Sequence, residues 1–245
     1  MSRLETEQLD ENTRRYYLDV MGIQCWELID SQQSGNRQEE VSTFDDSNRD
    51  VAVKNSSNIV ETIQQCTKCG LHKTRKQALA GRGNQSAKLL FVVLSPSASD
   101  DESGIVCGGE ADVLFSKMLA AINIDINDVY LSSLLKCSVP KNHTVSAKEI
   151  RSCIDHLTLQ IQQIQPKLLV VLGETAVRCL LQKDLSIDDY RAMNDELLAV
   201  PYSKLESLPL FVSYSPEELL QRPENKRKAW SDLQQLQKML ERTSA

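Results

Sequence analysis

The sequence predicts an α/β fold in which a mainly parallel sheet is covered by helices on both faces. Two patterns lead to this prediction. Four short apolar runs have the length and composition of buried strands: Leu89–Leu94, Val129–Leu135, Leu168–Leu172 and Leu210–Tyr214. Longer segments of helical periodicity alternate with them: Glu110–Asn123, Ser146–Gln163, Glu174–Gln182 and Asn225–Arg242.

Local signals place the elements and the domain boundaries. Ser146 and Glu149 have the spacing of a capping box, which predicts the start of the long central helix. Residues 31–57 are mostly polar and cannot bury enough surface to offset the entropy of ordering, so they are expected to be a disordered linker. The chain is thus divided into an N-terminal peptide (1–30), a linker (31–57) and a folded domain (58–242).

The charge of the chain bears on its partners. The formal net charge is −6 and the sequence pI is about 5.2, whereas tight sequence-independent DNA binding needs a basic footprint. The composition therefore favours protein partners and predicts weak or no direct DNA binding, apart from a small basic patch at Lys226, Arg227 and Lys228. No apolar run approaches the ~20 residues of a membrane span, and the N-terminus is too charged for a signal peptide. A cytoplasmic protein without membrane contact is expected.

Four of the seven cysteines have a pattern typical of a metal centre. Cys66 and Cys69 form a C-x-x-C pair, Cys137 ends a predicted strand, and Cys153 lies in the helix that follows. Four thiolates suit either zinc or an iron–sulfur cluster, and the spacing alone does not separate the two. Buried thiols that act as small hydrophobic groups are the alternative.

The segment from Cys66 to Trp230 resembles the family 4 uracil-DNA glycosylases, which are iron–sulfur proteins. The resemblance rests on CTKCGLHKTR, VYLSSLLKCSVPKNH, QPKLLVVLGETAVRCLL and SYSPEELLQRPENKRKAW. It implies a three-layer uracil-DNA-glycosylase-like fold with a central, mainly parallel four-stranded sheet. It also implies a [4Fe-4S] cluster, with zinc as the alternative, on four cysteines: Cys66, Cys69, Cys137 and Cys153.

The same resemblance places different residues at the positions that carry catalysis in the family. Leu94 stands where the family has an acidic residue that handles the attacking water, and it cannot accept a proton. Cys107 replaces the phenylalanine that stacks on the flipped base, and Ser133 replaces the asparagine that reads the uracil edge. Ser215 replaces the histidine of the Thr-x-His-Pro motif. The resemblance therefore predicts a domain with no catalytic residues.

The N-terminal peptide has the features of a partner-binding segment. Its run Arg14-Arg15, Tyr-Leu and Met-Gly-Ile-Gln-x-Trp is similar to the N-terminal peptide of the psi subunit of DNA polymerase III. In that family the peptide inserts into the collar of the clamp loader. Aromatic and methionine side chains commonly anchor interfaces, so seven residues are predicted to bind: Tyr16, Tyr17, Leu18, Met21, Gly22, Ile23 and Trp26.

Taken together, these resemblances predict a non-catalytic psi-type subunit of the DNA polymerase III clamp-loader complex. The peptide would bind the clamp-loader collar, and the globular domain would contact the chi subunit and, through it, single-strand-binding protein. Two alternatives stay open. One is a family 4 glycosylase with an altered active site in base-excision repair, with Asp100 or Asp101 as the carboxylates nearest the changed motif. The other is a cluster-dependent nucleic-acid sensor.

Overall fold

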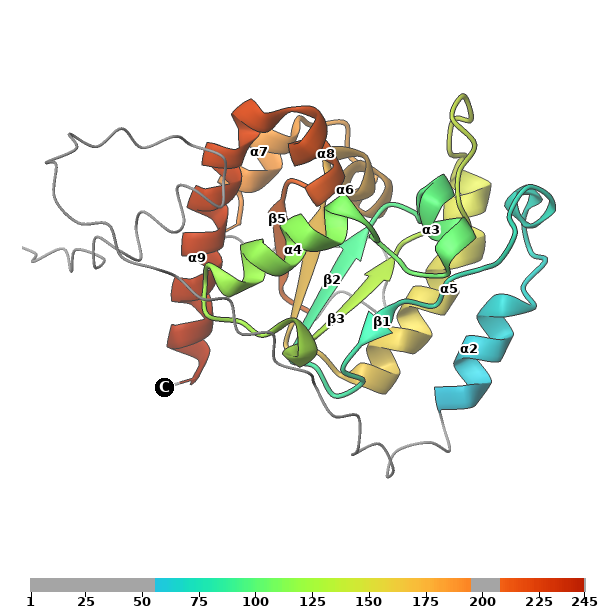
Figure 1. The fold of residues 1–245 in the computed structure, drawn as a ribbon, viewed down its shortest axis with the longest axis horizontal. Helices are drawn as coiled ribbons and strands as arrows, with labels where there is room; N and C mark the ends of the chain where they lie inside the picture. The colour runs from blue at the N-terminus through green and yellow to red at the C-terminus, as the bar shows by residue number, and fades with distance from the viewer. Residues whose placement is uncertain (1–55, 195–207, 245) are drawn as a thin grey trace, which may run out of the picture. The chain divides into compact units, whose positions relative to one another are not determined.

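The computed structural model describes residues 56–194 and 208–244. Within these residues the chain forms a sheet of five strands in the order β1-β3-β2-β4-β5 (Figure 1). The strands β2, β3, β4 and β5 are parallel, and β1 is antiparallel to β3. Their bounds are Arg82–Gly83 (β1), Leu89–Val93 (β2), Val129–Ser133 (β3), Leu168–Leu172 (β4) and Leu210–Ser213 (β5).

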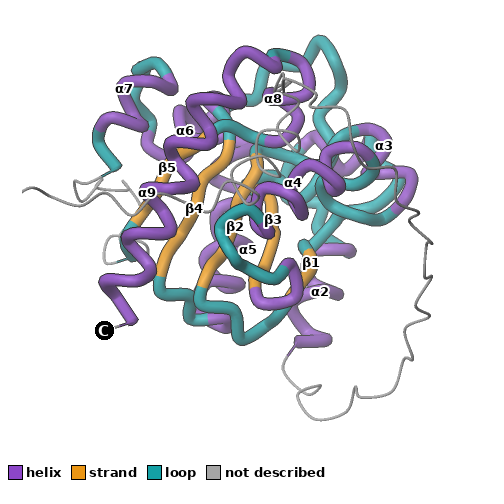
Figure 2. The backbone as a smooth tube through the Cα atoms, turned by 60° about the vertical axis from the view of Figure 1, so that its left-hand side comes forward, coloured by secondary structure: helices purple, strands orange, loops and turns teal. Residues whose placement is uncertain are grey.

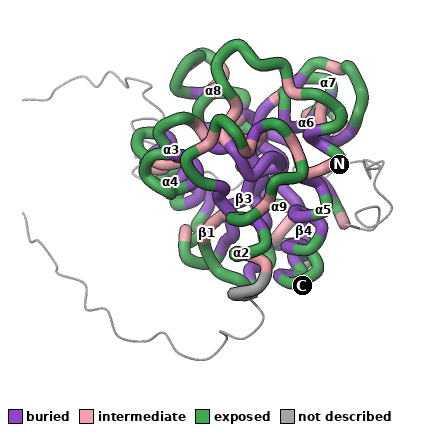
Figure 3. The backbone as a smooth tube through the Cα atoms, turned by 90° about the vertical axis from the view of Figure 1, so that its right-hand side faces the viewer, coloured by how far each residue is buried: buried purple, intermediate pink, exposed green. Residues whose placement is uncertain are grey.

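Every residue of the four parallel strands is buried, which explains why these strands have continuous apolar sequences rather than alternating ones. The central strand β2 pairs through Leu89 with Val129 of β3 on one side and with Leu168 of β4 on the other. Figure 3 shows the strands as the buried centre of the domain, with the exposed positions on the surrounding helices and loops.

Helices cover the sheet on both faces, with α4 in front of the strands and α5 behind them in the view of Figure 1, and Figure 2 shows the same elements from another side. On α4, Phe115 packs edge-on against Phe91 of β2, with ring centroids 5.1 Å apart. The helices are α2 (Ser56–Gln64), α3 (Ala98–Ser103), α4 (Glu110–Ala120), α5 (Ala147–Ile164), α6 (Glu174–Leu181), α7 (Ile187–Ala192), α8 (Pro216–Gln221) and α9 (Lys226–Ser244), with 3-10 turns η1 (Gly70–Lys73), η2 (Ile126–Asp128) and η3 (Pro223–Asn225).

The predicted α/β class, with its mainly parallel sheet and its two helical layers, is confirmed. The capping box of Ser146 and Glu149 is also present at the start of α5. The sheet has one strand more than the four predicted. The short β1 carries no apolar run, and it pairs with β3 because Gly83 lets the two backbones approach closely. A Cβ at Gly83 would lie 2.2 Å from the carbonyl oxygen of Val129.

Three short helices were not predicted, although each carries the same signal as α5. A capping box with serine at the N-cap and an acidic residue three positions later begins α3, α7 and α8. These helices have six residues each, too few to show a helical period. The N-terminal peptide and most of the predicted linker lie outside the described residues. None of the described helices is long and apolar enough to span a membrane.

Candidate active site and cysteine cluster

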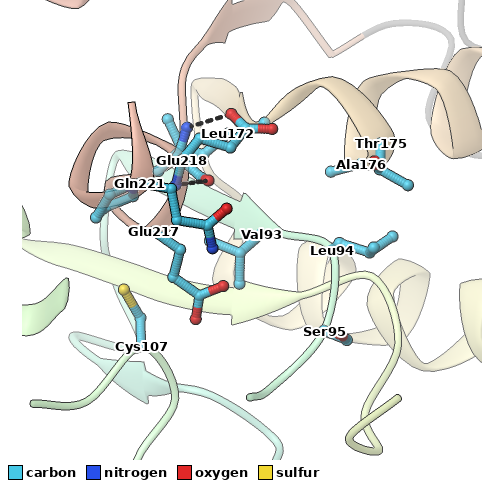
Figure 4. Close-up of a pocket in the computed structure, with 13 residues that line it drawn as sticks. Val93, Leu94, Ser95, Cys107, Leu172, Thr175, Ala176, Glu217, Glu218 and Gln221 are labelled. Atoms are coloured by element: carbon cyan, nitrogen blue, oxygen red, sulfur yellow. Dashed lines mark hydrogen bonds between the residues drawn. The ribbon is translucent and has the colours of Figure 1, made fainter. Parts of the chain in front are cut away.

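A pocket of about 180 Å³ opens at the carboxyl ends of the parallel strands, where ligands bind in open α/β sheets. Residues that follow β2, β4 and β5 line it, together with Cys107 from the loop between α3 and α4 (Figure 4). No aromatic side chain is among the lining residues: Val93, Leu94, Ser95, Cys107, Leu172, Gly173, Thr175, Ala176, Ser215, Pro216, Glu217, Glu218 and Gln221.

The structure brings together three of the four positions at which the catalytic residues of the resembled family were expected. Leu94, Cys107 and Ser215 all line the pocket. Ser133 does not line it, but it ends β3 directly beside Val93, and its buried hydroxyl has no partner among the described residues. Cys107 is buried, and burial together with the nearby Glu217 and Asp100 carboxylates raises the pKa of its thiol to about 12. The thiol therefore stays protonated at neutral pH.

Glu217 is the uncommitted carboxylate of the pocket. It lies in the first turn of α8, and Figure 4 shows its side chain directed toward Cys107. Within the described part of the chain, no hydrogen bond or ion pair engages its oxygens. Burial, Asp100 and Glu218 raise its pKa above the ordinary value for glutamate. Sequence comparison with family motifs did not identify Glu217, because it stands at none of the positions that those motifs assign to catalysis.

The other carboxylates around the pocket have structural roles. Glu218 accepts hydrogen bonds from the backbone N–H groups of Ser215 (3.1 Å) and Glu174 (2.9 Å), and so caps α8 while bridging to α6. Asp100 caps α3 and also accepts from the N–H groups of Cys107 (2.9 Å) and Gly108 (2.8 Å).

Asp101 lies outside the pocket lining, as Asp100 does, although both were the carboxylates that the sequence placed nearest the changed motif. Asp101 accepts from the N–H groups of Lys76 and Gln77 and from the hydroxyl of Ser138. Burial acts to raise its pKa, but these hydrogen bonds prevail and hold it below the ordinary value. Asp101 thus fastens the loop after η1 to the start of α3.

Three of the four cysteines of the predicted metal centre belong to a small apolar cluster that is separate from the main core around the sheet. Cys137 and Cys153 are buried in a small apolar cluster with Ile63, Leu71 and Leu135. Cys69 packs against this cluster, and Cys66 is half-buried beside it.

Burial disfavours the ionised form of the two buried thiols of this cluster. Burial raises the pKa of Cys153 to about 11, and the neighbouring Cys137 and Cys69 thiolates contribute to the increase. Burial also raises the pKa of Cys137, with contributions from Cys69 and Cys66. A bound cation would offset both effects, because metal ligation requires thiolates.

Arg75 ties the C-x-x-C segment to Cys137. One guanidinium nitrogen donates to the sulfur of Cys137 (2.8 Å), and the other donates to the carbonyl oxygens of Cys66 (2.8 Å) and Gln64 (2.9 Å). This contact places a positive charge beside a candidate metal ligand and lowers the cost of its ionisation.

His156 faces the same space. It lies three residues after Cys153 on α5, only 1% of its surface is exposed, and neither ring nitrogen has a partner among the described residues. Burial and the nearby charges of Lys68, Lys136 and Arg75 lower its pKa. These cations all belong to the segments that carry the cysteines.

A buried lysine lies between the cysteines and the sheet. The Lys136 ammonium donates to Ser132 Oγ (2.7 Å), Ser133 O (2.6 Å) and Gln160 Oε1 (2.6 Å), so its three protons are all used. Burial lowers its pKa to about 7.

The donor chemistry of this cluster fits an iron–sulfur group. Two thiols lie in one apolar cluster, a third packs against it, and the Arg75 guanidinium donates to the sulfur of Cys137. Zinc would need its ligands gathered around one ion at about 2.3 Å. Among the described residues, no three His, Cys, Asp or Glu side chains are arranged to hold a single ion. The identity of the metal therefore remains a prediction.

Comparison with known proteins agrees with the fold and overturns the predicted function. The family model described as the uracil DNA glycosylase superfamily matches residues 80–234. The type-4 uracil-DNA glycosylase of Archaeoglobus fulgidus is 31% identical over 180 residues, which are 73% of this chain and 89% of that protein. Those of Thermotoga maritima and Pyrobaculum aerophilum are 34% and 33% identical, over 49% and 50% of this chain and 62% of each relative.

The prediction of a psi-type clamp-loader subunit is wrong. The relatives are glycosylases, and none of these matches points to a DNA polymerase III psi subunit. The predicted partners are wrong for the same reason. They were the clamp-loader collar, the chi subunit and single-strand-binding protein. The prediction rested on about 16 residues of the N-terminal peptide, too short a match to weigh against 180 aligned residues. The seven residues predicted to bind the collar lie outside the described residues.

The expectation of a chain without enzymatic activity is likewise overturned, because the relatives are named as glycosylases, which are enzymes. The expectation of weak or no direct DNA binding is wrong for the same reason. Four substitutions at aligned positions had been taken to mean that the chemistry is lost. That inference considered only Asp100 and Asp101, the carboxylates nearest the changed motif in sequence, as replacements, and neither of them lines the pocket.

Proposed function

The chain belongs to the uracil DNA glycosylase superfamily, and from this premise we propose that it is a DNA glycosylase acting in base-excision repair. Its reaction is the hydrolysis of the bond between a deaminated or damaged base and its deoxyribose. The pocket at the carboxyl ends of β2, β4 and β5 receives the base after it has been rotated out of the DNA stack.

The observation that carries this proposal is the size and position of the pocket. A protein cavity of ~150 Å³ holds benzene, so about 180 Å³ is enough for a single six-membered base. The pocket is open on one side to a groove that shares Thr175, Glu218 and Gln221 with it. A base that remains attached to DNA can therefore enter while its sugar stays in the groove.

The residues of the pocket favour weak recognition of the base. Cys107 offers no aromatic face for stacking, and Ser133, at the position where the family has its base-reading asparagine, does not line the pocket. Specificity for uracil alone would require such contacts. We therefore expect several deaminated pyrimidines to compete for the pocket rather than uracil alone.

DNA binding is assigned to the basic residues that follow α8. Arg222 and Lys228 line the groove beside the pocket, and Lys226, Arg227 and Lys228 are the first three residues of α9. Phosphates bind to such local patches even when the whole chain is acidic, because the attraction falls off within about 10 Å at ordinary ionic strength.

The cysteine cluster is proposed to hold a [4Fe-4S] group on Cys66, Cys69, Cys137 and Cys153. The position of three of these cysteines in or against one apolar cluster and the contact of Arg75 with Cys137 support this assignment. The group would supply a covalent cross-link between the turn that follows α2, the loop that follows β3, and α5. Its ligands lie in an apolar cluster separate from the main core around the sheet.

The test is a single-turnover excision assay on oligonucleotides that each carry one uracil, 5-hydroxymethyluracil or other deaminated pyrimidine. The intact chain should release at least one of these bases. Thr175→Trp should abolish release, because Thr175 is exposed and lines the pocket, so that a large side chain fills the opening without disturbing the core. Thr144→Trp, at an exposed position outside the pocket lining, is the matched control. Failure of the intact chain to release any base would refute the proposal.

A further inference from the structure

We infer that Glu217 accepts the proton of the attacking water in this pocket, and so performs from α8 the role that Leu94 cannot perform at the end of β2. This inference rests on the proposed glycosylase function and assigns its reacting group. It rests on two observations: the Glu217 carboxylate has no hydrogen bond among the described residues, and the carboxylates of Glu218 and Asp100 are held by backbone N–H groups.

The pocket offers few groups able to accept a proton. The Cys107 thiol, with its pKa near 12, is not ionised at neutral pH. The Ser215 hydroxyl accepts the N–H of Glu218 as the N-cap of α8, and hydroxyl groups without a neighbouring base are weak bases. Ser95, Thr175 and Gln221 have no basic atom. Among the lining residues, the bases that remain are the carboxylates of Glu217 and Glu218.

Of these two, Glu218 is held in place by two backbone groups, and moving it would leave the N–H groups of Ser215 and Glu174 without this acceptor. Glu217 is bound by nothing in the described residues, and its carboxylate is accessible from the pocket. Figure 4 shows the Glu217 side chain extending from α8 toward Cys107, across the pocket from Leu94. A carboxylate so placed can contact a water molecule beside a bound sugar.

The surroundings of Glu217 adjust its basicity for this role. Glu217 is an exposed residue, and desolvation together with the Asp100 and Glu218 carboxylates raises its pKa. A carboxylate with a raised pKa is a stronger base than an ordinary glutamate, and general bases work best when their pKa approaches the working pH.

The step balances without any other reactant. The oxygen of one water molecule forms a bond to C1′ of the deoxyribose, and the bond between C1′ and the base nitrogen breaks. The bonding electron pair leaves with the base, and one proton of the water passes to the Glu217 carboxylate. This proton then returns to solvent or to the departing base. The net reaction consumes one water and yields a free base and an abasic site, with no change of oxidation state.

The test compares Glu217→Gln with the intact chain in single-turnover excision of the base that the intact chain releases best. Glutamine keeps the size of the side chain but cannot take the proton. We expect the rate to fall by about a hundredfold or more, the usual contribution of a general base. Binding to DNA that carries a stable abasic analogue should be unchanged, because the variant keeps the shape of the pocket. Glu241→Gln, on an exposed site of α9, is the matched control.

A pH profile and a second variant separate a catalytic role from a structural one. The rate of the intact chain should fall as the pH drops through the raised pKa of Glu217, because the protonated carboxyl no longer accepts a proton, and this limb should vanish in Glu217→Gln. Adding Leu94→Glu to Glu217→Gln should restore part of the rate by returning a carboxylate to the pocket.

The outcomes distinguish this inference from the function on which it rests. An intact chain that excises bases, with a Glu217→Gln rate within a few fold of it, would overturn the role of Glu217 and leave the glycosylase function standing. An intact chain that excises nothing would overturn both. If Glu217→Gln melts at a lower temperature than the intact chain, Glu217→Asp decides the matter. If Glu217→Asp excises the base more slowly and its rate still falls at low pH, the inference is supported. If its excision rate equals that of the intact chain, the inference is opposed.

Discussion

Replacement of His156 by phenylalanine tests whether the buried imidazole serves the proposed cluster. The ring lies among the cysteine-bearing segments, 1% exposed, with both nitrogens unpartnered in the described residues. A buried polar group without a partner costs roughly 1–3 kcal/mol, so the imidazole is a burden unless a bound group accepts its N–H. Phenylalanine has nearly the same shape and neither polar atom.

The magnitude follows from the kind of bond that would be lost. A hydrogen bond to a charged group contributes roughly 1.5–3 kcal/mol, and a thiolate-ligated cluster is an anionic acceptor. A loss of about 2 kcal/mol corresponds to about a thirtyfold change in an equilibrium or rate. We therefore expect a chelator to bleach the visible absorbance of iron-loaded His156→Phe about thirtyfold faster than that of the intact protein.

His156→Gln is the matched control, because glutamine retains a donor and an acceptor and should keep most of the resistance to the chelator. The reasoning is refuted if His156→Phe bleaches at the rate of the intact protein. It is also refuted if both variants bleach equally fast, because the N–H would then contribute nothing.

Three further predictions concern the metal, the DNA and the fold. Anaerobically purified protein should hold about four irons per chain, and Cys137→Ser should lose the iron and its colour, which metal analysis and absorbance will measure. Lys226→Ala should reduce the salt dependence of DNA binding by about one released counterion, seen as a shallower slope of log affinity against log salt. Hydrogen bonds from Lys228 and Tyr214 lower the pKa of Asp188 to about 2, so its stabilising effect is complete above about pH 3.8 and is lost as the pH falls toward 2. Asp188→Asn should lower the free energy of unfolding by about 1 kcal/mol at pH 7 in urea titrations, since the pair is half-exposed and solvent weakens it, and the difference should vanish near pH 2.

The sheet could be predicted from the sequence because its signal is local. A strand buried on both faces must be apolar at every position, and β2, β3, β4 and β5 each satisfy this over four or five residues. The strand β1 is different. It consists of Arg82 and Gly83, and its pairing depends on close backbone approach to β3, which no composition reveals. The capping boxes of the three six-residue helices can be read from the sequence. These helices are too short to show a helical period, so the sequence did not predict them.

The sequence likewise identified some of the candidate functional residues and missed others. The C-x-x-C spacing of Cys66 and Cys69, with Cys137 and Cys153 in the predicted elements that follow, indicated a metal centre, and the resemblance implied that all four are cluster ligands. Glu217 could not be found by reading aligned motifs, because the carboxylate enters the pocket from a different element than the motif predicts. Four substitutions at family positions suggested lost chemistry, whereas the folded chain brings a carboxylate to the same pocket from α8.

The bridge made by Glu218 has a consequence for how the pocket can vary. Its carboxylate joins the N-termini of α6 and α8, so the two walls that follow β4 and β5 are fixed to each other. A substituent added to the base therefore cannot be accommodated by spreading these walls. The opposite wall is the loop from Gly104 to Gly109, where Gly104, Cys107 and Gly109 all have positive φ. Changes in that loop, rather than in the helices, would set which modified bases the pocket admits.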